Sequence, residues 1–235
     1  MKEFELLKKF VDNEGQLSVL EGSEKIPFSI DRIFFVYGTA SLNKEKYDSG
    51  KIEIINISSS CVINTINDKV RLENHNALFL DKGEFINIEN IDNNSKLLVL
   101  VSKDFDINRF KKEYILKELI NKDCNSNHFI EYDIKRLYYI SDVPKNIRRG
   151  YHAHKKLKQY LTCFGGECTV LIDDGKETNN YILDNPEKGI YVYPCKWREM
   201  YNFSKEAVLL AVVSELYDEN DYIRDYNSFR KYIGK

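Results

Sequence analysis

Short runs of apolar residues, rich in β-branched and aromatic side chains, recur along the first half of the chain. Asn, Asp, Gly and Ser separate these runs, so each is bounded by residues that favour turns. The runs lie at 30–38, 51–58, 61–66, 77–80, 85–90 and 97–101. Short strands at this spacing predict an all-β sandwich or barrel.

A second series of such runs fills the other half of the chain, and it repeats features of the first. IDRIFFVYG (30–38) and IKRLYYISD (134–142) share one pattern, and LLVLVSKDFD (97–106) has a counterpart in VLLAVVSELYD (208–218). We infer an internal duplication. The runs of the second series lie at 133–141, 159–164, 168–173, 180–183, 189–194, 199–203 and 207–214.

The two series are separated by INRFKKEYILKELI (107–120), in which apolar residues recur three and four positions apart. This period predicts a helix. We therefore expect one β domain over 1–106, a connecting helix over 107–122 and a second β domain over 123–235.

The composition limits the partners that such a chain can bind. The 235 residues include 35 Lys and Arg against 37 Asp and Glu, a net charge of −2. Nucleic acids and anionic membranes select for a strongly positive surface, so we expect neither as a partner. No apolar run approaches the roughly 20 residues of a membrane helix, and MKEFELLKKF (1–10) does not resemble a signal peptide. We expect a cytoplasmic protein.

The five cysteines are odd in number and lack paired CxxC spacing. This usage favours reduced, buried thiols over a disulfide framework or a zinc site. The cysteines are Cys61, Cys124, Cys163, Cys168 and Cys195.

Two of the four histidines, His152 and His154, are two residues apart. On a strand such residues point to the same face, so the imidazoles would lie side by side. The pair could be a chance surface pair, part of a metal site, or an acid/base pair, since the pKa of imidazole lies near neutrality. A metal site would have to add ligands from Glu199, Asp173, a cysteine, His75 or His128.

Four motifs in the second half occur in a specific order: RGYHAHKKLKQ (149–159), LIDDG (171–175), GIYVYPCKWREMYNFS (189–204) and YDENDYIRDYNSFRKYI (217–233). With them, 129–233 resembles the sugar 3,4-ketoisomerases, WxcM-like cupin enzymes of the FdtA and QdtA type. The resemblance implies tandem cupin (jelly-roll) barrels and an isomerase that moves the keto group of dTDP-4-keto-6-deoxyglucose from C4 to C3. Because no histidine follows His154, we expect no metal ion, and the isomerisation requires no redox cofactor. The resemblance also implies a role in deoxyaminosugar synthesis for surface glycans such as O-antigen lipopolysaccharide.

The resemblance also implies the site residues. The family's two active-site histidines match His152 and His154, and its strand tyrosine matches Tyr139. We assign His154 as the base, His152 as its partner or proton shuttle and Tyr139 as a hydrogen-bond donor. The expected substrate-binding residues are Arg149, Arg198, Lys155, Gln159, Arg136 and Glu14.

The first half departs from the family pattern, because LNKEKYDSGK (42–51) stands where the histidine motif should be and Phe35 replaces the tyrosine. One active site per chain is therefore expected. Arg198 resembles the gluco-forming type of the family and Glu14 fits neither type, so the configuration of the product at C4 is left open. A sugar-nucleotide epimerase and a non-catalytic sugar-binding cupin are the alternative functions.

The glycine hairpin that opens the family's fold occurs once, within VDNEGQLSVLEG (11–22), and the second half has no counterpart. A barrel without its edge hairpin exposes unpaired backbone groups. We predict that 14–22 crosses over to complete the second barrel and brings Glu14 near the histidine pair. The two halves would then form a pseudo-dimer within one chain, and a further homodimer is left open.

Overall fold

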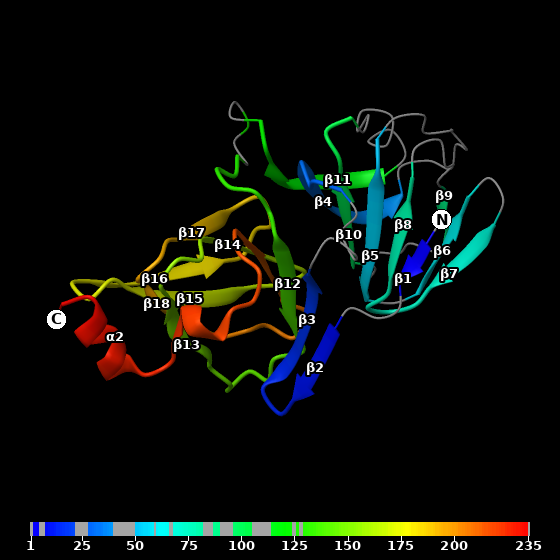
Figure 1. Ribbon diagram of the computed structural model, residues 1–235. Coiled ribbons are helices and arrows are strands. Elements are labelled where there is room, and N and C mark those ends of the chain that lie inside the picture. Colours follow the sequence, from blue (N-terminus) through cyan, green and yellow to red (C-terminus); the bar gives the residue numbers. More distant parts are fainter. Residues whose placement is uncertain are drawn as a thin grey trace. The chain divides into compact units, whose positions relative to one another are not determined.

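The computed structural model describes residues 2–4, 8–21, 28–39, 50–58, 60–65, 68–81, 87–89, 96–104, 114–123, 126 and 129–234. The chain divides into two compact units. Unit 1 consists of Met1–Leu7 and Ser23–Glu131, and unit 2 consists of Lys8–Gly22 and Tyr132–Lys235. Each unit is built from antiparallel strands (Figure 1).

Unit 2 contains a six-stranded and a five-stranded sheet, with strand orders β17-β14-β19-β12-β3-β2 and β16-β15-β18-β13-β20. Their apolar inner faces pack together in one core, as in a jelly roll. The strands are β2 (Lys8–Asp12), β3 (Gly15–Glu21), β12 (Arg136–Ser141), β13 (Arg149–His154), β14 (Gln159–Phe164), β15 (Cys168–Asp173), β16 (Thr178–Leu183), β17 (Gly189–Val192), β18 (Trp197–Tyr201), β19 (Val208–Val213) and β20 (Tyr222–Ile223).

Two short helices belong to the C-terminal part of unit 2, the 3-10 helix η1 (Glu219–Asp221) and the α-helix α2 (Tyr226–Tyr232). Asp225 caps α2 by accepting a hydrogen bond from the backbone N–H of Ser228. Phe229 of α2 packs with Ala153, Trp197 and Ile223. This contact fixes the C-terminal segment beside β13 (Figure 1).

Unit 1 contains sheets with the orders β1-β8-β5-β10-β4-β11 and β7-β6-β9. The strands are β1 (Lys2–Phe4), β4 (Arg32–Thr39), β5 (Ile52–Ser58), β6 (Cys61–Asn64), β7 (Lys69–Leu72), β8 (Ala77–Leu80), β9 (Asn87–Glu89), β10 (Lys96–Val101) and β11 (Tyr114–Asn121). The two units therefore confirm the expected tandem all-β architecture.

The large sheets of the two units have matching strand orders. The run β8-β5-β10-β4 in unit 1 corresponds to β17-β14-β19-β12 in unit 2. The next position is filled by β11 in unit 1 and by β3 in unit 2. The prediction that 14–22 completes the second barrel is confirmed, because β3 pairs with β12 from Arg136↔Glu21 to Ser141↔Gln16.

The predicted helix at 107–120 is wrong where the structure describes it, because 114–121 forms β11. This strand pairs with β4, and its register shifts between Glu118 and Ile120. A β-bulge of this kind buries both Leu119 and Ile120, which a regular strand would place on opposite faces. The bulge explains why the apolar spacing looks helical. Residues 107–113 lie outside the described part of the chain.

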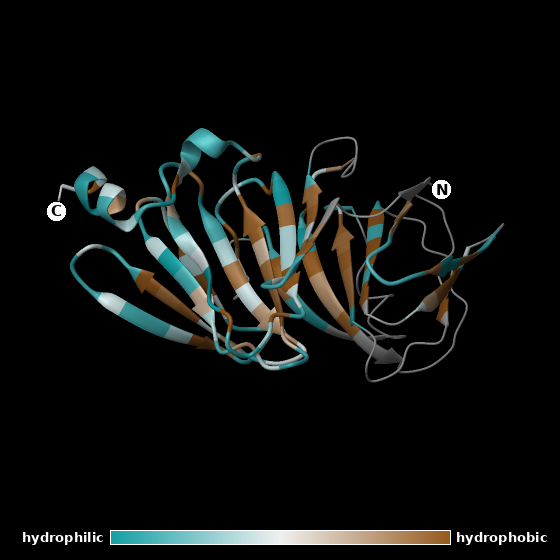
Figure 2. Cartoon of the chain, turned by 90° about the horizontal axis from the view of Figure 1, so that it is seen from below, coloured by the Kyte–Doolittle hydropathy of each residue, from teal (hydrophilic) through white to brown (hydrophobic). Residues whose placement is uncertain are grey.

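The interiors of the two units differ in chemistry. In unit 1, aliphatic and aromatic side chains fill the space between the sheets, with Phe34, Ile54, Leu78 and Val99 all fully buried. In unit 2, hydrophilic and hydrophobic residues alternate along the strands (Figure 2). The buried polar side chains of this unit include Arg136, His154, Gln159 and Arg198. Unit 1 also buries the polar side chains of Glu53, Asn56 and His75, and burial raises the pKa of Glu53 to about 8. Among the described residues, the buried group of His, Arg and Gln side chains lies in unit 2.

Candidate active site

The polar end of the interior of unit 2 is built from both sheets. On the large sheet, Arg136 of β12 and Gln159 of β14 flank β19, because both are the Cα partners of Val213. On the facing sheet, His152 of β13 is the Cα partner of Arg198 of β18. Deeper in the barrel the same strands contribute apolar residues such as Ile140, Leu161 and Met200.

A bulge in β13 precedes the two histidines. Gly150 and Tyr151 have φ angles of 99° and 49°, and the pairing with β18 shifts between Gly150 and His152. A Cβ on Gly150 would come within 2.8 Å of the Arg198 carbonyl oxygen, so this position requires glycine. Beyond the bulge, the rings of His152 and His154 lie on one face with centroids 5.1 Å apart.

Hydrogen bonds at the Nδ1 atoms set the tautomers of both imidazoles. His152 Nδ1 lies 2.7 Å from the carbonyl oxygen of Gly150, and His154 Nδ1 lies 2.8 Å from Oδ2 of Asp221. Both partners are acceptors, so each Nδ1 carries the hydrogen and each Nε2 is left with a lone pair. The site thus offers two imidazole nitrogens that can accept a proton.

Burial keeps both imidazoles neutral at physiological pH. It lowers the pKa of His152 to about 3, with a further contribution from the positive charge of Arg198. Burial, followed by Arg198, also lowers the pKa of His154. His154 is 1% exposed and His152 is half-buried, so His152 lies closer to solvent.

Arg198 is a fully buried cation beside the two imidazoles. Burial lowers its pKa to about 10, which still leaves it charged near pH 7. Several buried polar atoms of this site have no hydrogen-bond partner within the chain, and a polar ligand could satisfy them. They are His154 Nε2, Arg198 Nη2, Arg136 Nε and Gln159 Oε1.

The tyrosine that joins this site is Tyr138 and not Tyr139. Gln159 donates a hydrogen bond from Nε2 to the Tyr138 hydroxyl, and Arg198 acts electrostatically on that hydroxyl. Burial raises the pKa of Tyr138, so the phenol keeps its proton. Tyr139 points to the opposite face of β12, where it shares a hydrogen bond with Ser18. Alternation along a strand explains the correction, and the counterpart of Tyr138 in unit 1 is Phe34.

The segment between β19 and α2 packs against the histidine pair. The ring of Tyr222 lies 4.3 Å from that of His154 and 5.1 Å from that of His152, centroid to centroid. The guanidinium of Arg224 stacks on Tyr222 and pairs in a bidentate manner with Glu219. These contacts place an aromatic wall along one side of the site.

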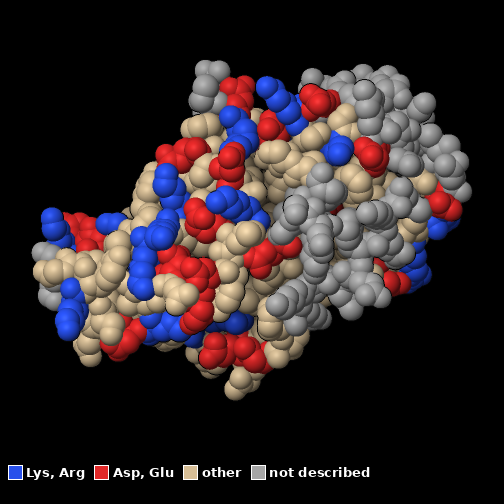
Figure 3. Space-filling view, viewed as in Figure 1, with Lys and Arg blue, Asp and Glu red and all other residues tan. Residues whose placement is uncertain are grey.

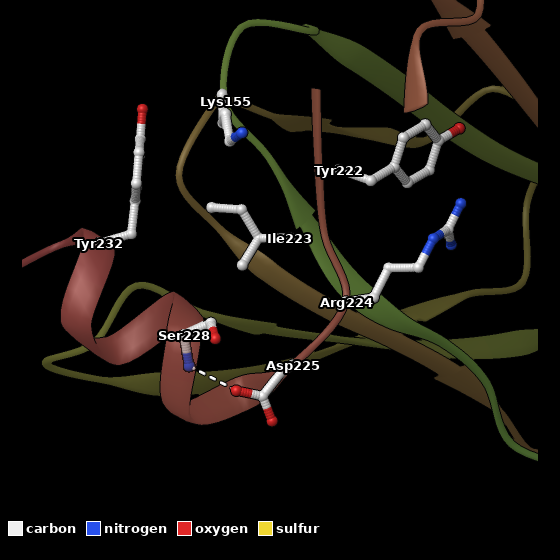
Figure 4. Close-up of a pocket in the computed structure, with 7 residues that line it drawn as sticks. All are labelled: Lys155, Tyr222, Ile223, Arg224, Asp225, Ser228 and Tyr232. Carbon is white, nitrogen blue, oxygen red and sulfur yellow. Dashed lines mark hydrogen bonds between the residues drawn. The ribbon is translucent and has the colours of Figure 1, made fainter. Parts of the chain in front are cut away.

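Three other predicted substrate-binding residues lie elsewhere. Arg149 donates a hydrogen bond of 3.0 Å to the Glu14 carbonyl oxygen, and Arg149 Nε lies 3.9 Å from Glu14 Oε2. Glu14 thus reaches the start of β13, three residues before His152, and is exposed. Lys155 lines a separate pocket of about 430 Å³ between α2 and β20, where its amine donates to the Asn220 carbonyl oxygen (Figure 4).

Sequence reasoning missed Tyr138, Asp221 and Tyr222. Strand alternation was the available signal for Tyr138, because the inward position of β12 has the parity of Arg136 and Ile140. Asp221 and Tyr222 lie in the motif YDENDYIRDY, which was part of the basis for the family resemblance. Neither residue was assigned a role from the sequence. Their place beside the histidines depends on long-range folding that no local pattern encodes.

The described residues show no cluster of three or more His, Cys, Asp or Glu side chains suited to a metal ion. Cys61, Cys163, Cys168 and Cys195 are free thiols, and Cys124 and His128 lie outside the described residues. No helix in the described part is long and apolar enough to cross a membrane. On the face in Figure 3, basic and acidic side chains are interspersed.

The family model "FdtA: WxcM-like, C-terminal" matches the chain twice, over residues 2–121 and 117–234. The chain belongs to this family. The two matches confirm the internal duplication, and both reach into β11. The FdtA-like chain is also 49% identical over 109 residues to TDP-4-oxo-6-deoxy-α-D-glucose-3,4-oxoisomerase of Aneurinibacillus thermoaerophilus, covering 46% of this chain and 78% of that relative.

Solved structures similar to this FdtA-like chain include two ketoisomerases. QdtA of Thermoanaerobacterium thermosaccharolyticum, a sugar 3,4-ketoisomerase in complex with TDP, is 40% identical, with a TM-score of 0.47 over 52% of this chain and 85% of that chain. WlaRA of Campylobacter jejuni, a TDP-fucose-3,4-ketoisomerase, is 37% identical, with a TM-score of 0.47 over 51% and 86%.

Proposed function

We propose that unit 2 is a 3,4-ketoisomerase that converts a TDP-linked 4-keto-6-deoxyhexose into its 3-keto isomer. The observation that carries the proposal is the pair of neutral imidazoles beside a buried Arg198 and a protonated Tyr138. The relative of 49% identity, which is named for this reaction, supports the choice of substrate. A 3-keto product is the form from which a 3-amino sugar for surface glycans can be made.

The reaction moves two hydrogens and needs no external oxidant. A base removes the hydrogen from C3, which the neighbouring C4 ketone makes acidic, and a proton that can exchange with solvent is added to C4. The proton of the C3 hydroxyl moves to the oxygen at C4. C3 is thereby oxidised and C4 is reduced by the same two electrons.

The exposure of the two rings favours His152 as the base that removes the proton from C3. This reverses the assignment from sequence, in which His154 was the base. A general base must reach the proton that it removes, and His152 lies closer to solvent than the enclosed His154. We assign the proton transfer between the two oxygens to His154 and Tyr138. Arg198 would stabilise the negative charge that develops on the enediolate oxygen.

We further propose that the reaction needs no metal ion. The guanidinium of Arg198 acts electrostatically on both imidazoles. A divalent ion bound at the histidine pair would be repelled by this charge, because buried charges are only weakly screened by solvent. Arg198 can itself supply the positive charge that the enediolate requires.

Incubation of the full chain with TDP-4-keto-6-deoxyglucose in deuterated water, followed by NMR of the sugar ring, tests the function. We expect deuterium at C4 and a ketone at C3. The coupling between H4 and H5, measured on product made in ordinary water, reports the configuration that the sequence leaves open. Inversion at a ring carbon with the ketone still at C4 would show an epimerase instead, and an unchanged sugar would refute catalysis.

His152→Asn and His154→Asn should each lower turnover by about 10²-fold or more, as expected for the loss of an acid/base group. Because His152 acts at carbon, His152→Asn should also stop the wash-in of deuterium. Wild-type turnover in both variants would contradict the assignment of the pair.

A further inference from the structure

Asp221 lies behind His154 and takes no part in the proton transfers assigned above. Its Oδ2 accepts the hydrogen bond from His154 Nδ1 at 2.8 Å, and its Oδ1 accepts from the backbone N–H of Lys156 at 2.7 Å. The carboxylate is thus held between a ring on β13 and the backbone that follows β13.

The backbone of Asp221 is fixed as firmly as its side chain. Its carbonyl oxygen accepts from the N–H of Lys155 at 2.9 Å, and its own N–H donates to the carbonyl oxygen of Asp218 at 3.1 Å. Asp218 also caps η1 by accepting from the N–H of Asn220. The position of Asp221 relative to His154 is therefore determined by several independent hydrogen bonds.

We propose that Asp221 is a positioning residue that holds His154 in the Nδ1–H tautomer and so keeps a lone pair on Nε2 for the substrate. His154 Nε2 is enclosed and has no partner in the chain. If the hydrogen were on Nε2, the ring could not accept a proton from a substrate hydroxyl. The assignment of this role in catalysis rests on the proposed function, whereas the tautomer itself does not.

The proposal explains why the C-terminal motif accompanies the histidine motif. Residues 217–225 contribute no inner strand of the large sheet, yet they bring Asp221 to His154 and the Tyr222 ring to both histidines. The bidentate pair between Arg224 and Glu219 closes this segment on itself. Its placement determines the protonation pattern of the site.

Asp221→Asn is the direct test, with Asp225→Asn as the matched control. An asparagine can turn its amide N–H toward Nδ1, which forces the ring hydrogen onto Nε2. Asp225 caps α2 without touching either histidine, and asparagine is an equally good cap. Both variants lose one carboxylate from the same segment.

The readout is the ¹⁵N spectrum of the histidine rings in the full chain without substrate, with His154 identified by its absence from His154→Asn. We expect Nδ1–H in the wild type and in Asp225→Asn, and Nε2–H in Asp221→Asn. Turnover of TDP-4-keto-6-deoxyglucose should fall about 10²-fold in Asp221→Asn alone. An unchanged tautomer or unchanged turnover in this variant would overturn the proposal.

Fluorescence of Trp197 shows whether each variant is folded. If Asp221→Asn does not fold, the wild-type spectrum still decides, because Nε2–H on His154 there would refute the proposal. Failure of the proposed function would give a different result, namely the expected tautomers in a chain that does not convert the sugar.

Discussion

Acid should destabilise unit 2 specifically through its buried histidines. The pKa of His152 is about 3 in the folded chain and about 6.5 in the unfolded chain. Between these values the unfolded state binds more protons, so the free energy of unfolding falls as the pH falls below 6.5. The lowered pKa of His154 acts in the same direction.

The size of the effect follows from proton linkage. At pH 5 the folded imidazole of His152 is still neutral, whereas nearly all of the unfolded chains carry the proton. The decrease in the free energy of unfolding then depends only on the difference between the pKa of the unfolded chain and pH 5. About 1.5 pH units at 1.36 kcal/mol per unit gives about 2 kcal/mol for each histidine.

Unfolding in urea, followed by fluorescence, measures this loss for unit 2 alone. Trp197 is the only tryptophan of the chain, and it is buried against Phe229 and Tyr226 in this unit. We expect the wild type to lose about 2 kcal/mol more than His152→Asn between pH 7 and pH 5. Lys145→Gln, at an exposed position, controls for the loss of one titratable side chain and should follow the wild type.

Carboxyl groups that titrate in the same range act equally on all three proteins and cancel in the comparison. Equal losses in the wild type and His152→Asn would refute the reasoning. Such a result would mean that the pKa of His152 is not lowered in the folded chain, so that this imidazole is not kept neutral between pH 7 and pH 5.

Three further predictions concern the site and the exchanged strand. Tyr138→Phe should lower turnover by about 10-fold or more because it removes a hydrogen-bond donor from the site, whereas Tyr139→Phe should leave turnover within about 2-fold. Equal effects would contradict the finding that the two tyrosines lie on opposite faces of β12. Incubation with EDTA should leave activity unchanged, and a loss that one divalent ion reverses would show that a metal is required. Ser18→Pro in β3 should lower the free energy of unfolding reported by Trp197 by roughly 1 kcal/mol or more, because β3 pairs on both sides, and an unchanged urea midpoint would contradict this.

The sequence allowed the architecture to be predicted because its signals are local and repeated. Alternating apolar runs gave the strands, and the paired runs at 30–38 and 134–142 gave the duplication. The helix at 107–120 failed because a bulge in β11 places Leu119 and Ile120 together in the core, which produces helical spacing within a strand. Periodicity alone does not distinguish these two cases.

The site was predictable to the extent that its residues lie on regular strands. The structure places His152 opposite Arg198 on paired strands, and it places the ring of His154 beside that of His152. The choice of Tyr139 failed by one residue, which on a strand is a change of face. Asp221 could not be predicted, because its contact with His154 spans 67 residues of sequence and depends on how the C-terminal segment folds back.

The strand exchange gives a physical reason for retaining a first unit in which LNKEKYDSGK stands in place of the histidine motif. In the large sheet of unit 2, β3 lies between β2 and β12, and Ser23–Glu131 separates β3 from β12 along the chain. Closing an unfolded loop of this length costs about 5 kcal/mol of chain entropy. A folded unit 1 has two defined ends, so most of this entropy is lost when unit 1 folds and not when β3 pairs.

A second strand is exchanged in the opposite direction. The strand β11 precedes the second repeat along the chain, just as β3 precedes β4 in the first repeat, yet β11 pairs with β4 of unit 1. The first half lacks the histidine motif, but its β3 strand still completes the large sheet of the unit that contains His152 and His154.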